Sequence, residues 1–109
     1  MNKLIIVTIL ALTACSDGPE SVNEQAMQEI VSQFKGNEEH AAIDAIWTSP
    51  KMFKVAVGDD GSNRDGYARY ACSVLNDHGM TTGYRVEIVD IQSVVSGSNW
   101  VELGSADCG

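Results

Sequence analysis

The sequence has few of the residues on which metal and phosphate chemistry depends. Only two histidines occur, His40 and His78, and they form neither an H-x-x-x-H nor an H-E-x-x-H pattern. No CxxC pair is present, so the sequence does not predict a zinc site. It also lacks a P-loop, a dinucleotide-binding fingerprint and a G-x-S-x-G motif. We therefore expect no metal, no cofactor and no catalytic residues.

Basic residues are scarce as well. Seven lysines and arginines stand against 15 aspartates and glutamates, which gives a formal net charge of -8 at pH 7. Binding to nucleic acid requires a basic face that contacts phosphates, so nucleic acid is not expected as a partner. Peripheral adhesion to anionic lipid is disfavoured for the same reason. An acidic domain suits solubility or a basic partner.

The first fifteen residues carry the clearest motif. Lys3 precedes an apolar run from Leu4 to Leu12. This run is shorter than the roughly 20 residues that span a bilayer, so it is typical of a cleaved signal. The ending Leu12-Thr13-Ala14-Cys15 resembles the lipobox of bacterial lipoproteins. The resemblance covers only this export signal, and an ordinary secretory signal with a chance cysteine is the alternative.

The resemblance implies where the protein works. Residues 1–14 would be removed, and Cys15 would be acylated, normally with three acyl chains, so that the membrane holds the protein stably. Ser16 in second position favours the outer membrane facing the periplasm, whereas Asp17 weakens that assignment. The lipidated end and tether, residues 15–20, reach only about 17 Å beyond the cysteine at roughly 3.3 Å per residue. We expect the domain to act close to its membrane.

Two further cysteines, Cys72 and Cys108, follow in the mature chain. Export places them in an oxidising compartment, where an even pair in a small domain predicts a disulfide. The bond would close a long loop, for which the chain-entropy relation gives roughly 4 kcal/mol of stabilisation.

Hydrophobic periodicity predicts the elements of a single domain over residues 21–109. Apolar residues recur at helical spacing over residues 22–35 and 67–75, where Asp65 and Gly79 suit the two ends of the second helix. Residues 41–48 and 52–57 predict a hairpin in which Ile43, Ala45 and Trp47 share one side. Residues 84–89 and 100–103 are typical of strands, with a short helical turn at 90–95 between them. The order α-β-β-α-β-β predicts a small two-layer α+β domain, with helices packed on a mostly antiparallel sheet.

A loop between the hairpin and the second helix, residues 58–66, and the first residue of that helix hold the candidate binding residues. These are three carboxylates and their neighbours: Asp59, Asp60, Arg64, Asp65 and Tyr67. Carboxylate oxygens suit calcium, but the spacing does not fit an EF-hand, and a turn with a helix cap accounts for the same residues. Trp47 and Trp100 are interpreted as core or sheet-face residues, with a binding platform as the alternative.

These observations favour a lipid-anchored protein of the cell envelope that acts as a non-catalytic binding or inhibitory module near the membrane. Its expected partners are the membrane, through the lipid, and another envelope protein. A structural or assembly accessory of the envelope is the alternative. A hydrolase that pairs Asp59 or Asp60 with Asp65 is less favoured, because about 95 residues leave little room for a substrate cleft.

Overall fold

The computed structural model describes residues 19–35 and 41–109. The predicted signal, Cys15 and most of the tether, as well as His40, lie outside these residues. No helix in the two described ranges is long and apolar enough to cross a membrane.

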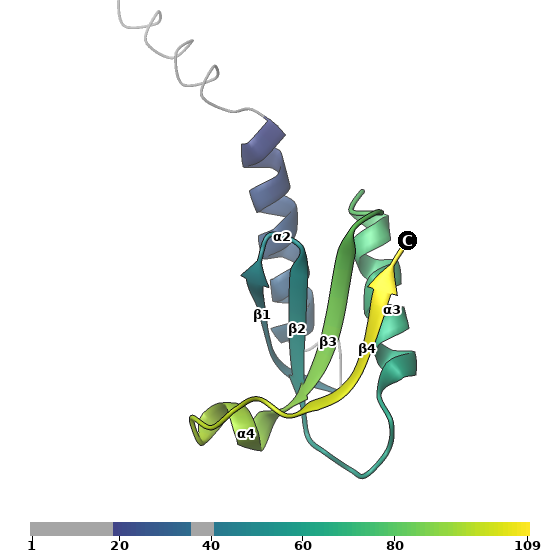
Figure 1. The fold of residues 1–109 in the computed structure, drawn as a ribbon. Helices are drawn as coiled ribbons and strands as arrows, with labels where there is room; N and C mark the ends of the chain where they lie inside the picture. Colours follow the sequence, from purple (N-terminus) through teal and green to yellow (C-terminus); the bar gives the residue numbers. More distant parts are fainter. Residues whose placement is uncertain (1–18, 36–40) are drawn as a thin grey trace, which may run out of the picture.

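The described chain forms three helices and four strands, and the strands make one sheet with the order β1-β2-β3-β4 (Figure 1). The elements are α2 (Pro19–Lys35), β1 (Ala42–Ser49), β2 (Met52–Val57), α3 (Asp65–Asp77), β3 (Tyr84–Asp90), α4 (Ile91–Val95) and β4 (Glu102–Cys108). The predicted α+β class is confirmed, and the order contains the additional short helix α4.

The sheet is mixed: two of its three strand pairs are antiparallel, which fits the expected mostly antiparallel sheet, and the central pair is parallel. The outer pairs, β1 with β2 and β3 with β4, are antiparallel, whereas the central strands β2 and β3 run parallel. Helix α3 is the reason, because it carries the chain from the end of β2 back to the level at which β2 began. The loop before α3 and the helix α4 therefore follow the same ends of the two central strands (Figure 1).

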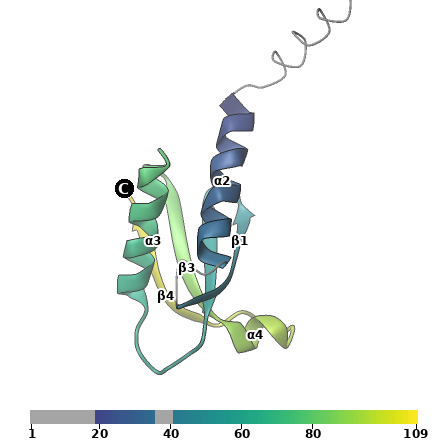
Figure 2. The same cartoon turned by 180° about the vertical axis from the view of Figure 1, so that it is seen from behind.

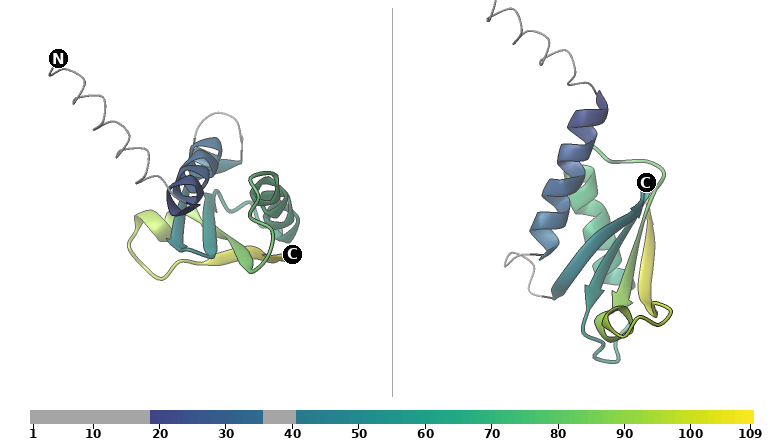
Figure 3. Two further views of the ribbon diagram at one scale, coloured as in Figure 1. Left: turned by 90° about the horizontal axis from the view of Figure 1, so that it is seen from above. Right: turned by 90° about the vertical axis from the view of Figure 1, so that its left-hand side faces the viewer.

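Helices α2 and α3 cover one face of the sheet, and the views from behind and from above show both on the same side (Figures 2 and 3). The core lies between these helices and the sheet. Phe34 of α2 meets Phe53 of β2 edge-on, with ring centroids 5.5 Å apart. The largest fully buried side chains come from all these layers: Phe34, Phe53, Ile30, Leu75, Ile88, Val55, Val57 and Val86.

A β-bulge changes which side chains of β1 reach the core. The register with β2 shifts between Ala42 and Asp44, so Ala42 and Ala45 are buried while Ile43 is 53% exposed. The predicted common side for Ile43, Ala45 and Trp47 is therefore wrong for Ile43, because a bulge interrupts the two-residue alternation of a strand. Trp47 packs partly into the core and donates its indole N–H to the Met27 carbonyl at 3.1 Å.

The end of α3 follows its sequence signals closely. Gly79 has a φ of +83°, its N–H donates to the Asn76 carbonyl, and the Met80 N–H donates to the Leu75 carbonyl. This pair of bonds is a Schellman motif, for which glycine is suited because it lacks a Cβ. The range of strand β4 differs more from the one that the sequence predicts. It occupies 102–108 rather than 100–103, because its pairing with β3 extends to Cys108.

Candidate functional site

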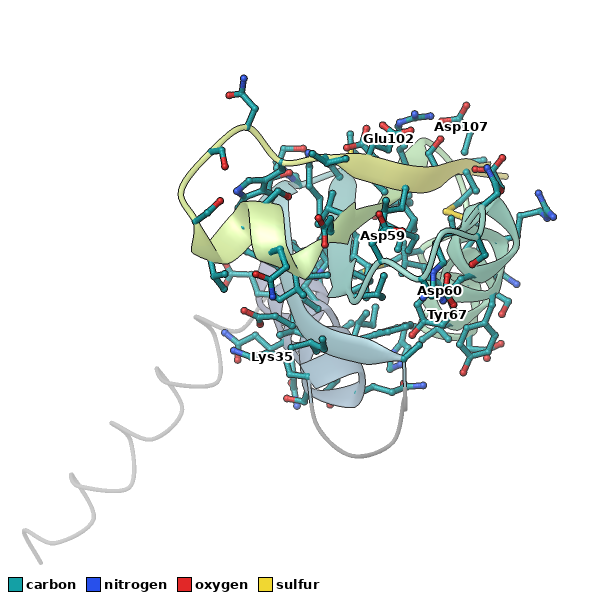
Figure 4. The ribbon with its side chains drawn as sticks, turned by 90° about the horizontal axis from the view of Figure 1, so that it is seen from below. Lys35, Asp59, Asp60, Tyr67, Glu102 and Asp107 are labelled. Carbon is teal, nitrogen blue, oxygen red and sulfur yellow. A yellow bond between two sulfur atoms is a disulfide. The ribbon has the colours of Figure 1, made fainter. Side chains whose placement is uncertain are left out.

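The acidic loop is folded by its own side chains. Asp59 accepts a hydrogen bond from the Gly61 N–H at 2.9 Å, and Asp60 accepts from both the N–H and the hydroxyl of Ser62, at 2.9 and 2.6 Å. The Ser62 hydroxyl, more than any other group, lowers the pKa of the Asp60 carboxyl below its usual value. Asp59 and Asp60 remain exposed at the end of the molecule seen from below in Figure 4.

Arg64 and Asp65 point into the fold rather than toward a partner. The Arg64 guanidinium donates to the Gly58 carbonyl at 2.9 Å and lies 3.6 Å from the Asp60 carboxylate. The Asp65 carboxylate accepts the Ser105 N–H at 2.9 Å. Helix α3 begins at Asp65, so Asp65 is its first residue and not the N-cap that the sequence predicts. The side-chain oxygen of Asn63 accepts the Asp65 N–H at 2.8 Å.

Tyr67 also belongs to the packing of the domain. Its half-buried ring stacks on Tyr70 and meets Phe34 edge-on, with centroid separations of 5.9 and 6.3 Å. The structure therefore separates the five sequence-predicted binding residues into two exposed carboxylates and three residues that hold the fold. Within residues 19–35 and 41–109, no three histidine, cysteine or acidic side chains converge in a way that could hold a metal ion.

The predicted disulfide is confirmed. Cys72 of α3 is bonded to Cys108 at the end of β4, and the bond closes a separation of 36 residues. It fastens the helix layer to the outer strand of the sheet and fixes the C-terminal residues.

The face of the sheet opposite α2 and α3 carries a row of charges across β2, β3 and β4. The Lys54 ammonium lies 2.9 Å from the Glu87 carboxylate, and Arg85 lies 3.2 Å from Glu87 and 2.9 Å from Asp107. Burial would raise the pKa of the Glu87 carboxyl, but the hydrogen bonds from Lys54 and Arg85 outweigh it and lower that pKa. The pKa of the Arg85 guanidinium is raised, chiefly by its bond to Asp107.

Beside these charges lies an apolar groove of about 410 Å³. Its floor combines side chains from the uncovered sheet face with side chains from α4 and the segment after it: Ile46, Lys54, Ala56, Val89, Val94 and Trp100. Asp44, Val31 and Lys35 also line it, so the groove extends along β1 toward α2. The Lys54 ammonium stands 5.7 Å from the centre of the Trp100 ring.

Two of the six exposed large apolar side chains of the described residues, Ile46 and Trp100, line this apolar groove. Three more adjoin lining residues in the chain, since Ile43 precedes Asp44, Val95 follows Val94 and Val101 follows Trp100; the sixth, Tyr70, lies on α3. Exposed apolar side chains that meet at a groove are typical of an interaction surface. Of the exposed apolar residues on this surface, the sequence indicated only Trp100 as a candidate for binding. Trp100 is 39% exposed and therefore lies outside the core.

A second hollow, of about 450 Å³, lies between α2 and the end of α3. Polar side chains line it, and the His78 ring nitrogen Nδ1 lies 3.8 Å from the Glu29 carboxylate. It has no apolar floor, so the apolar groove is the better candidate for binding a partner.

Comparison with known proteins gives no match, whether with protein families, with curated proteins or with solved structures. The function is therefore argued from the chain's own surface and from its N-terminal motif.

Proposed function

We propose that this protein is a lipid-anchored protein of the cell envelope whose domain binds a partner protein through the apolar groove, without catalysis. The observation that carries the proposal is a groove on the uncovered sheet face that is lined by the exposed apolar side chains Ile46 and Trp100. When a partner covers water-exposed isoleucine, valine or tryptophan, the complex is stabilised by roughly 25 cal/mol per Å² of apolar surface removed from water. The lipobox-like motif at Cys15 supports attachment to a membrane.

The arrangement of the domain suits this role. Helix α2 begins at Pro19, four residues after the proposed lipidated cysteine. The start of α2 and the loop before α3 lie at opposite ends of the molecule, and α4 is at the same end as that loop (Figure 1). A protein held at its N-terminus would thus present α4, Trp100 and the exposed Asp59 and Asp60 away from the membrane. We place it in the outer membrane, facing the periplasm.

The two exposed aspartates contribute charge rather than a built site. Asp59 and Asp60 lie in a chain of net charge -8, and both stay exposed although their carboxylates accept hydrogen bonds from the loop. Such charges steer a basic partner toward a surface and mainly affect the association rate. We therefore expect Asp59→Ala and Asp60→Ala to slow association, and substitutions in the apolar groove to speed dissociation.

Photo-crosslinking in intact cells tests the binding surface. A photoreactive amino acid is placed at Ile46, which lines the groove, at the exposed Val95, which follows the lining residue Val94, and at Asn76 on α3 as the matched exposed control. We expect one dominant protein adduct from Ile46 and Val95 and none from Asn76. Adducts of the same intensity from all three positions, or from Asn76 alone, would rule out binding at this surface.

The anchor is tested separately. Intact mass spectrometry of the membrane fraction should show a protein that begins at Cys15 and carries acyl chains, and Cys15→Ser should release the protein from the membrane. A mature protein without acyl chains would remove the anchor from the proposal and leave the binding surface standing.

A further inference from the structure

Strand β1 has an open outer edge. It stands first in the sheet order and pairs only with β2 among the described strands. When the molecule is viewed from that side, β1 is the nearest strand and no described helix stands in front of it (Figure 3, right). An open edge offers backbone N–H and C=O groups to a further strand.

One backbone donor of this edge is satisfied by a side chain. The Ala45 N–H donates to the Asp44 carboxylate at 2.8 Å, and the same carboxylate oxygen lies 3.6 Å from the Lys35 ammonium. The side chains of Asp44 and Lys35 are about half exposed, at 52% and 54%. A neighbouring side chain that accepts an edge N–H blocks the edge only weakly, because the carbonyl of an incoming strand can replace it.

We propose that the partner segment bound by this protein is an extended strand that adds to the edge of β1 and carries basic side chains. Its alternate apolar side chains enter the apolar groove beside Ile46 and Trp100. Main-chain hydrogen bonds to an open edge supply affinity in this mode, and pockets for alternate side chains supply specificity. The inference rests on the proposed function and specifies the kind of partner.

The charges around the groove indicate the sign of the charge that the partner carries. Both of its lysines are engaged, Lys54 with Glu87 and Lys35 with Asp44. Glu102, which lies across from Val89 in the sheet, is exposed and forms no ion pair with another described residue. The uncompensated charge beside the groove is therefore negative, as is the chain as a whole, and this complements lysine or arginine in the partner.

A second copy of this chain fits the edge less well. Two identical edge strands related by a two-fold axis pair antiparallel, as in an isologous dimer. The α2 helices of the two copies would then start at opposite ends, so one membrane could not hold both N-termini. Two chains of net charge -8 also repel one another.

The test uses the purified, disulfide-bonded protein and a phage-displayed library of random nonapeptides as the probe. We expect enrichment of peptides with alternating apolar residues and a net positive charge. Synthesising an enriched peptide with N-methyl groups on alternate residues should abolish binding, because it removes main-chain donors without changing side chains. Failure to enrich any peptide, or enrichment of acidic peptides, would overturn the inference.

Two variants separate strand addition from simple burial of side chains. The double variant Lys35→Ala, Asp44→Ala frees the Ala45 N–H without changing the net charge, because the two groups form an ion pair, and it should tighten binding of the enriched peptide by about twofold to fivefold. Ile46→Lys should weaken it by about tenfold or more, through lost apolar contact and repulsion of a basic peptide. Asn76→Lys, with the same charge change on α3, should leave binding unaltered. A double variant Lys35→Ala, Asp44→Ala that binds no more tightly would contradict strand addition.

The outcomes for the two proposals are distinguishable. A crosslinked partner that meets Ile46 through a helical segment would uphold the proposed function and refute the added strand. Concentration-dependent dimerisation that Ile46→Lys abolishes would assign the edge to a second copy and refute it as well. Circular dichroism of each variant establishes that the domain is folded before binding is measured.

Discussion

The carboxylate of Asp65 accepts a hydrogen bond from the backbone N–H of Ser105, 40 residues further along the chain, at 2.9 Å. The two residues of β4 that precede Ser105 also contact the start of α3. The Leu103 carbonyl accepts the Arg64 N–H at 3.0 Å, and Gly104 lies directly against the Arg64–Asp65 peptide. The start of α3 is therefore fastened to β4, which is why Arg64 and Asp65 serve the fold.

Removing the Asp65 carboxylate should destabilise the domain. Asp65→Ala leaves the partly buried Ser105 N–H without its acceptor, which should lower the free energy of unfolding by about 1–3 kcal/mol. Asp65→Asn keeps an oxygen in place and should cost less. Asp59→Ala, in the exposed loop, serves as the control and should stay near ±0.5 kcal/mol, as is usual for surface changes. Urea unfolding measures all three, and equal losses for Asp65→Ala and Asp59→Ala would contradict this role.

A methyl group at Gly104 should be far more damaging than one at Gly58. A Cβ on Gly104 would lie 2.3 Å from the Arg64 carbonyl carbon and 2.5 Å from the Asp65 nitrogen, whereas a Cβ on Gly58 meets nothing within 4 Å. Backbone atoms cannot yield as a flexible side chain can, so Gly104→Ala should cost about 3 kcal/mol or more, the upper range for overpacking. Thermal unfolding of both variants provides the comparison, and a Gly104→Ala variant as stable as Gly58→Ala would show that α3 can move away from β4.

Local patterns in the sequence predicted most of the elements but not how they pair. The helical spacing around Phe34 and Leu75 and the glycine at Gly79 correspond to observed features because they act within a few residues. The bulge that exposes Ile43 depends on the register with β2, and the length of β4 depends on its pairing with β3. Both are long-range relations that a single sequence does not record.

The candidate site was predictable only in part for the same reason. The Cys72–Cys108 bond followed from the expected compartment and an even cysteine count. The acidic loop drew attention because its charges are adjacent in the chain, yet its polar atoms mostly bond to one another. The apolar groove joins Ile46, Val89 and Trp100 from three distant segments, so only the folded sheet reveals it.

Reduction of the disulfide should lower stability substantially. Cys72 and Cys108 are 36 residues apart, and the chain-entropy relation gives about 4 kcal/mol for a loop of that length. We expect the double variant Cys72→Ser, Cys108→Ser to show this loss in urea unfolding, and the reducing agent to destabilise the unmodified protein but not the variant. Two thiols that react with a labelling reagent in the native, unreduced protein would contradict the bond.

Glu87 should make the stability of the domain depend on pH. Its pKa in the folded state lies below the usual value, because the hydrogen bonds from Lys54 and Arg85 outweigh the effect of burial. The unfolded chain therefore binds the proton more readily, with a pKa of about 4.3. The stabilisation is complete above that value and is lost as the pH falls through the lower, folded pKa. Urea unfolding at a series of pH values should show this loss, and Glu87→Gln should reduce its slope, whereas Glu24→Gln on the exposed side of α2 should not. Parallel pH profiles for the unmodified protein and Glu87→Gln would show that the contacts with Lys54 and Arg85 do not favour the ionised form.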